Sequence, residues 1–139
     1  MQDIFQKTIL EPIIFEGIGL HKGVNSKLKL IPAKDDEGIE FIRTDLKINN
    51  KIKANYKNVS CAKLCTTLSN SQKVSVSTVE HLMAAFYLTG IDNIKVEIDN
   101  SEVPIMDGSS KEFVEKIKKT GLKNLRKKRK FLKIIKNIN

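Results

Sequence analysis

Two adjacent residues, Glu80 and His81, have side chains that could together carry out hydrolysis. Imidazole is a common zinc ligand, and a carboxylate beside it can accept a proton from an activated water molecule. Neighbouring residues of a helix point about 100° apart, so both side chains can border one cleft while Val79 and Leu82 face the core. The pair predicts Glu80 as a catalytic base and His81 as a metal ligand. A carboxylate is also favoured at a helix start for purely structural reasons, and that alternative stays open.

Other candidate metal ligands are few. Catalytic zinc usually takes three protein ligands and leaves one position open, but the chain has only two histidines and two cysteines. Ala85 occupies the position where a His-Glu-x-x-His motif has its second histidine. Cys61 and Cys65 have no second pair spaced to complete a structural zinc site, and Cys65 is expected in a strand as a small core residue. His21 stands in a glycine-rich loop, where it either lines a cleft or faces solvent.

The helix that carries the Glu-His pair is predicted to begin at Ser77 or Thr78, either of which could cap it, and to end at Gly90. A second helix is predicted from Ser109 or Ser110 to Gly121. Each helix has apolar residues at helical spacing. The expected buried residues are Val79, Leu82, Met83 and Phe86 in the first helix, and Phe113, Val114 and Ile117 in the second.

Alternating apolar residues and turn signals predict several strands around these helices. They are residues 7–15 (one strand, or two that meet at Pro12), 27–31, 39–43, 64–68, 74–77, 92–99 and 131–138. Strands 27–31 and 39–43 are expected to form a hairpin around the acidic turn 35–38. The predicted fold is an α+β two-layer sandwich, with two helices packed on one face of a mostly antiparallel sheet.

The positive charge of the chain is concentrated at its end. Of the net charge of +9, residues 111–139 carry 12 Lys and Arg against 2 Glu, whereas the rest is close to neutral. The densest run, 126–130, is either a solvated connector or a site for phosphates or an anionic membrane surface. Because no aromatic residue interrupts it, stacking on single-stranded nucleic acid is disfavoured. We therefore expect no nucleic acid partner and at most peripheral membrane contact.

Composition excludes two other classes of protein. No apolar run approaches the roughly 20 residues that cross a bilayer, so an integral membrane protein is excluded. Two cysteines in 139 residues are too few for a disulfide scaffold. Free thiols fit a reducing cytoplasm, where we expect the protein to act.

Six stretches, in order along the chain, resemble one known family. They are residues 15–23, 41–46, 64–68, 77–85, 90–93 and 102–109. The family is UDP-3-O-acyl-N-acetylglucosamine deacetylase, the zinc hydrolase of lipid A biosynthesis in Gram-negative bacteria. The resemblance implies a cytoplasmic enzyme that removes the acetyl group from the glucosamine nitrogen of a UDP-linked, 3-O-acylated sugar, with one Zn²⁺ per complete active site.

The resemblance also implies residue roles. His81 matches the first zinc ligand and Glu80 the general base, whereas Leu64 and Cys65 match substrate-contacting residues of the cleft and His21 matches a loop histidine near it. Members of the family place the active site between two similar α+β domains.

The second domain of the family supplies the other two zinc ligands and the general acid. We therefore expect residues 1–125 to form the first domain, and residues 126–139 to be a basic linker and the first strand of the second. The chain alone is expected to bind zinc weakly and to be inactive unless a second chain supplies the missing domain. The competing hypothesis is a non-catalytic module whose basic tail binds RNA or an anionic surface.

Overall fold

The computed structural model describes residues 4–136, which form strands, two α-helices and one short 3-10 helix. Of the two alternatives predicted for residues 7–15, the structure has two strands, β1 and β2, with Pro12 between them. The elements in chain order are β1 (Phe5–Ile9), β2 (Ile13–Ile18), β3 (Asn25–Pro32), β4 (Ile39–Arg43), β5 (Lys51–Lys53), η1 (Tyr56–Asn58), β6 (Val59–Cys61), β7 (Thr67–Ser69), β8 (Ser75–Val76), α1 (Glu80–Thr89), β9 (Ile94–Ile98), α2 (Lys111–Thr120) and β10 (Leu122–Lys128).

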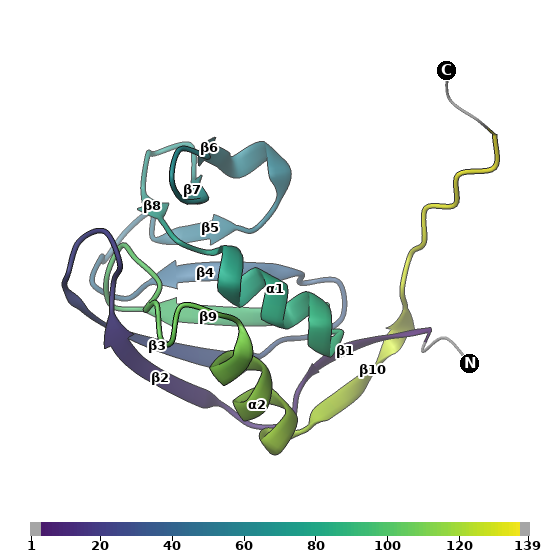
Figure 1. Ribbon diagram of the computed structural model, residues 1–139. Helices are drawn as coiled ribbons and strands as arrows, with labels where there is room; N and C mark the ends of the chain where they lie inside the picture. Colours follow the sequence, from purple (N-terminus) through teal and green to yellow (C-terminus); the bar gives the residue numbers. More distant parts are fainter. Residues whose placement is uncertain (1–3, 137–139) are drawn as a thin grey trace.

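A five-stranded sheet in the order β2-β3-β9-β4-β5 forms the main layer. Its pairs are antiparallel except for β4 and β9, which run parallel. Both α-helices lie side by side across one face of this sheet, and the small sheet β6-β7-β8 lies beyond β5 (Figure 1). The predicted α+β two-layer sandwich with a mostly antiparallel sheet is therefore confirmed.

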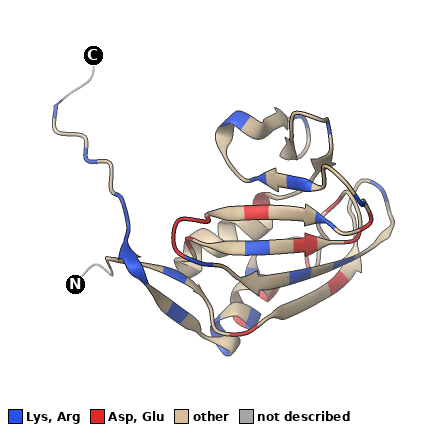
Figure 2. Ribbon diagram, turned by 180° about the vertical axis from the view of Figure 1, so that it is seen from behind, with Lys and Arg blue, Asp and Glu red and all other residues tan. Residues whose placement is uncertain are grey.

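The core lies between the main sheet and the helices. In β9, Ile94, Val96 and Ile98 are fully buried on the helix side, because alternate residues of a strand point to the same face. Leu82 and Phe113, from α1 and α2, are buried opposite them. Lys95 and Glu97 alternate with these buried residues in β9 and are only partly buried, and Figure 2 shows residues of both charge signs along the strands of the sheet. This is the pattern of a half-solvated antiparallel sheet.

Three predictions about strands differ from the structure. The hairpin of 27–31 with 39–43 is wrong, because β9 lies between β3 and β4 and pairs with both. The strand predicted over 64–68 begins only at Thr67. Residues 131–136 form no strand, although the apolar pattern favoured one, and residues 137 and 138 lie outside the described residues.

The basic run is held to the body of the protein by carboxylates. Strand β10, which includes the first part of the run, pairs antiparallel with β1. The Lys127 backbone N–H donates to Asp35 (2.7 Å), and the Lys127 ammonium donates to Asp36 (2.5 Å). Arg129 Nε donates to both carboxylate oxygens of Asp92 at 2.9 Å. Part of the run thus differs from the solvated connector expected from the sequence.

The Asp92 carboxylate should be the main contact that fixes the end of β10. It also accepts the Lys7 backbone N–H at 2.7 Å, so that it binds β1 and the residue that directly follows β10. We expect Asp92→Ala to lower the free energy of unfolding by about 1.5–3 kcal/mol, the range for hydrogen bonds to charged groups. Urea denaturation measures this, with the exposed Glu11→Ala as the control for loss of a negative charge. An equal effect of the two substitutions would contradict the assignment.

Candidate active site

The first turn of α1 places Glu80 and His81 at the edge of the core. Val79, just before the helix, is 2% exposed and Leu82 is fully buried, so the start of the helix is fixed against the sheet. Glu80 and His81 lie between these two anchors, and both are half-buried. Neither side chain is enclosed in hydrocarbon, and both remain partly accessible.

A loop before β7 contacts the same turn. The Thr66 backbone N–H donates to Glu80 Oε2 (3.0 Å), and the Val79 N–H donates to the Thr66 carbonyl (3.4 Å). One oxygen of the Glu80 carboxylate is thereby held in place. Sequence analysis missed Thr66, because a backbone donor has no signature in the side-chain pattern.

Leu64 and Cys65 lie in this loop, not in a strand. Leu64 has a φ of 65° and its side chain is 85% exposed, whereas Cys65 is half-buried with its Sγ 3.8 Å from Thr67 Oγ1. The prediction that Cys65 is a core residue of a strand is therefore wrong. A left-handed φ at Leu64 bends the chain before it can pair, and brings the loop against α1.

Neither predicted cap residue caps α1. Ser77 Oγ donates to the Ser101 carbonyl (3.1 Å), and Thr78 Oγ1 donates to Glu102 Oε1 (2.8 Å). The cap position is Val79, and its side chain makes no cap hydrogen bond. Both hydroxyls are used to bind the segment after β9 because Ser77 and Glu102 form a parallel bridge.

Glu102 is the buried carboxylate at the base of the glycine-rich loop. It is fully buried and accepts the backbone N–H groups of His21 and Lys22, both at 3.0 Å. Burial by itself would raise the pKa of Glu102, but the hydrogen bonds from His21, Thr78 and Lys22 outweigh it and leave that pKa below its ordinary value. The carboxyl group is therefore ionised inside the protein. His21 itself is exposed.

The side chains around His81 differ in how well they fit a metal ion. His81 Nδ1 is buried and has no hydrogen-bond partner within residues 4–136. An unsatisfied buried imidazole nitrogen is costly, and coordination to a metal would satisfy it. Among the described residues, however, no group of three or more His, Cys, Asp or Glu side chains could hold a metal ion. The described residues therefore fit a metal site as the source of a single ligand, His81.

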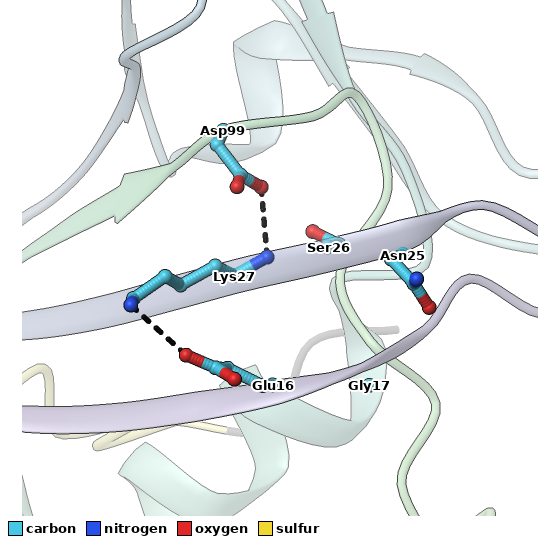
Figure 3. Close-up of a pocket in the computed structure, with 6 residues that line it drawn as sticks. All are labelled: Glu16, Gly17, Asn25, Ser26, Lys27 and Asp99. Atoms are coloured by element: carbon cyan, nitrogen blue, oxygen red, sulfur yellow. Dashed lines mark hydrogen bonds and ion pairs between the residues drawn. The ribbon is translucent and has the colours of Figure 1, made fainter.

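Two pockets differ in where they lie relative to Glu80 and His81. A pocket of about 460 Å³ is lined by the β2-β3 hairpin and Asp99, and the Lys27–Glu16 ion pair (2.9 Å) lies across it (Figure 3). Its lining contains no histidine or cysteine, and neither Glu80 nor His81 belongs to it. A smaller, mostly apolar pocket of about 210 Å³ lies beside Thr66, Val79 and Met83, next to the Glu-His pair.

Because folding lowers the pKa of Glu102, its contribution to stability should depend on pH. The contribution is complete above the ordinary Glu pKa of about 4.3 and is lost as the pH falls through the lower value of the folded state. We expect Glu102→Gln to reduce the free energy of unfolding at pH 7 by about 1–3 kcal/mol, and the difference from the wild type to shrink below about pH 4. Urea denaturation between pH 7 and 3 measures this, with Glu115→Gln as an exposed control. A difference independent of pH would contradict an ionised Glu102.

Comparisons with known proteins agree on one family. Residues 6–139 match the sequence model of the family described as UDP-3-O-acyl N-acetylglycosamine deacetylase. Proteins named UDP-3-O-acyl-N-acetylglucosamine deacetylase are similar to the chain. The one from Nautilia profundicola is 47% identical over 133 residues, which are 96% of this chain and 44% of that relative. The one from Solibacter usitatus is 44% identical over 130 residues, or 94% of this chain and 43% of that relative.

A third relative, from Brucella melitensis biotype 2, is 40% identical over 134 residues, which are 96% of this chain and 46% of that protein. The chain thus spans less than half the length of these curated relatives. The family match includes the glycine-rich loop, the loop at Thr66 and the start of α1, all of which form the candidate site. On this match, the chain belongs to the UDP-3-O-acyl N-acetylglycosamine deacetylase family.

Proposed function

We propose that this chain contributes the general base and one metal ligand to a zinc-dependent deacetylase that acts on UDP-3-O-acyl-N-acetylglucosamine in lipid A biosynthesis. The observation that supports this most is the first turn of α1. There the Glu80 carboxylate is held by the Thr66 N–H at 3.0 Å, and the neighbouring His81 has a buried ring nitrogen without a partner. The names of the relatives supply the substrate.

In this proposal each residue has a defined task. Glu80 Oε2 is fixed by Thr66, and Glu80 Oε1 accepts the proton of the water that attacks the acetyl carbonyl carbon. The C–N bond then breaks, the sugar amine receives a proton, and acetate leaves. His81 would hold Zn²⁺, which when bound supplies a Lewis acid for the carbonyl and the water. Leu64, Cys65 and His21 would contact the substrate from the two loops beside α1.

A second α+β domain should cover the outer face of α1. Tyr87 is 87% exposed and Leu88 is 66% exposed on the same helix as His81, and Ala84, about one turn before them, is also exposed. An apolar helix face of this kind is typical of a surface that packs against another element. We propose that the missing zinc ligands and the general acid come from such a domain, in the same or another chain. Residues 1–125 would be the first domain, with the 125/126 boundary falling inside β10.

The proposed location is the cytoplasm. No helix within residues 4–136 is long and apolar enough to span a membrane. Cys61 and Cys65 are both free thiols, as expected in a reducing compartment. Because the substrate carries an acyl chain, peripheral membrane contact is compatible with this proposal.

Complementation tests the proposal. The chain would be mixed with the part of the Nautilia profundicola relative that follows the matched region, in the presence of Zn²⁺ and UDP-3-O-acyl-N-acetylglucosamine. We expect acetate release from the mixture and none from this chain alone. Glu80→Ala and His81→Ala should each lower the rate at least 100-fold, since they remove the base and a metal ligand.

Glu115→Ala, an exposed site on α2, is the matched control and should leave the rate unchanged. Acetate release that persists in both the Glu80 and the His81 variants would contradict the proposal. So would full turnover by this chain alone. Circular dichroism of each variant separates loss of catalysis from loss of folding.

The alternative, a binding module that uses the basic tail, has less support. Lys127 and Arg129, two of the five charges in the 126–130 run, are paired with Asp36 and Asp92. Pairing with carboxylates leaves fewer charges for phosphates. Three other residues of the run are exposed and remain available to bind phosphates in this alternative: Arg126, Lys128 and Lys130.

A further inference from the structure

Glu102 connects two segments of the candidate site that are far apart in sequence. Its Oε1 accepts both the His21 N–H (3.0 Å) and the Thr78 hydroxyl (2.8 Å), and its Oε2 accepts the Lys22 N–H (3.0 Å). The His21 backbone and the Thr78 side chain therefore bind the same oxygen atom. Thr78 stands only two residues before Glu80.

The backbone at Thr78 is held in a conformation that threonine rarely adopts. Its φ is 58°, in the left-handed region that is unfavourable for an L-residue and most of all for a β-branched one. The hydrogen bond from the Thr78 hydroxyl to the buried Glu102 carboxylate offsets this cost, because hydrogen bonds to charged groups are stronger than neutral ones. The contact with Glu102 therefore helps to maintain the turn that leads into α1.

The glycine-rich loop is built closely around this carboxylate. A Cβ atom at Gly19 would lie 2.5 Å from Glu102 Oε2, so a larger residue there would have to displace the Glu102 carboxylate. Gly23 in the same loop differs, because a Cβ atom there would meet nothing within 4 Å although its φ is +64°. The two glycines therefore offer a matched pair: one is required by contact with Glu102, and the other by backbone conformation alone.

We propose that Glu102 is a positioning residue that fixes the loop carrying His21 against the turn that leads into Glu80 and His81. The inference rests on the proposed function, since it concerns the relative placement of groups in that site. Glu102 touches neither substrate nor metal in this account. It acts through Thr78 and through the His21 and Lys22 amides.

Coupling between the two segments tests the proposal by NMR on the full chain without substrate or metal. The chain has two histidines, so the imidazole signals of His21 and His81 can be assigned separately. In Gly19→Ala, the added methyl group should displace Glu102 and change the loop amides, the Thr78 amide coupling constant that reports φ, and the His81 imidazole signals. The His21 and Lys22 amides should exchange with solvent at least 10-fold faster.

Gly23→Ala should disturb the loop but leave the Thr78 and His81 signals unchanged. Glu102→Gln should reproduce the effects of Gly19→Ala, and the double variant should show no further change at Thr78, because both act through one contact. Val103→Ala, a fully packed neighbour, controls for a general loss of core stability.

Effects of Gly19→Ala that stay within the loop, or additive effects of Gly19→Ala and Glu102→Gln at Thr78, would overturn the proposal. The result is separable from the proposed function. Failure of complementation with the NMR coupling intact would reject the deacetylase site while leaving Glu102 as the link between the two segments.

Discussion

The burial of Val79 and Leu82 on either side of the Glu-His pair is the constraint on which the candidate site depends. Hydrophobic packing of these two residues fixes the position and rotation of the first turn of α1. Glu80 and His81 therefore lie at the boundary between core and solvent. Hydrophobic packing thus places the Glu80 and His81 side chains. The hydrogen bonds from Thr66 to Glu80 and from Thr78 to Glu102 fix this turn further.

The polar contacts around the site have one feature in common: a carboxylate accepts backbone N–H groups of a loop. Carboxylates bind the loop before β7 and the loop before β3. Glu80 accepts the Thr66 amide, and Glu102 accepts the amides of His21 and Lys22. A carboxylate that accepts backbone N–H groups holds a loop without a side-chain partner in that loop. Both loops of the candidate site are thereby held in fixed positions.

Periodicity was sufficient to predict the layers of the fold. The alternation over 94–98 and the apolar stripes of both helices placed the core correctly, because burial of one face governs both patterns. Pairing of β9 between β3 and β4 could not be predicted, since strand order is decided by packing over the whole sheet. In the sequence Glu102 is an ordinary loop acid, because its backbone donors, the His21 and Lys22 amides, lie 81 and 80 residues away. The strained φ at Thr78 likewise follows from that contact.

The most direct test of the central claim is to locate where Zn²⁺ binds on this chain. The ring nitrogens of the two histidines can be followed by ¹⁵N NMR during titration with Zn²⁺, with the Thr66 and Glu80 amides as reporters of the surrounding site. We expect weak binding in which the signals of the His81 nitrogens and of these two amides shift, while those of His21 stay unchanged. Shifts confined to His21, to Cys61 and Cys65, or to neither histidine would contradict it.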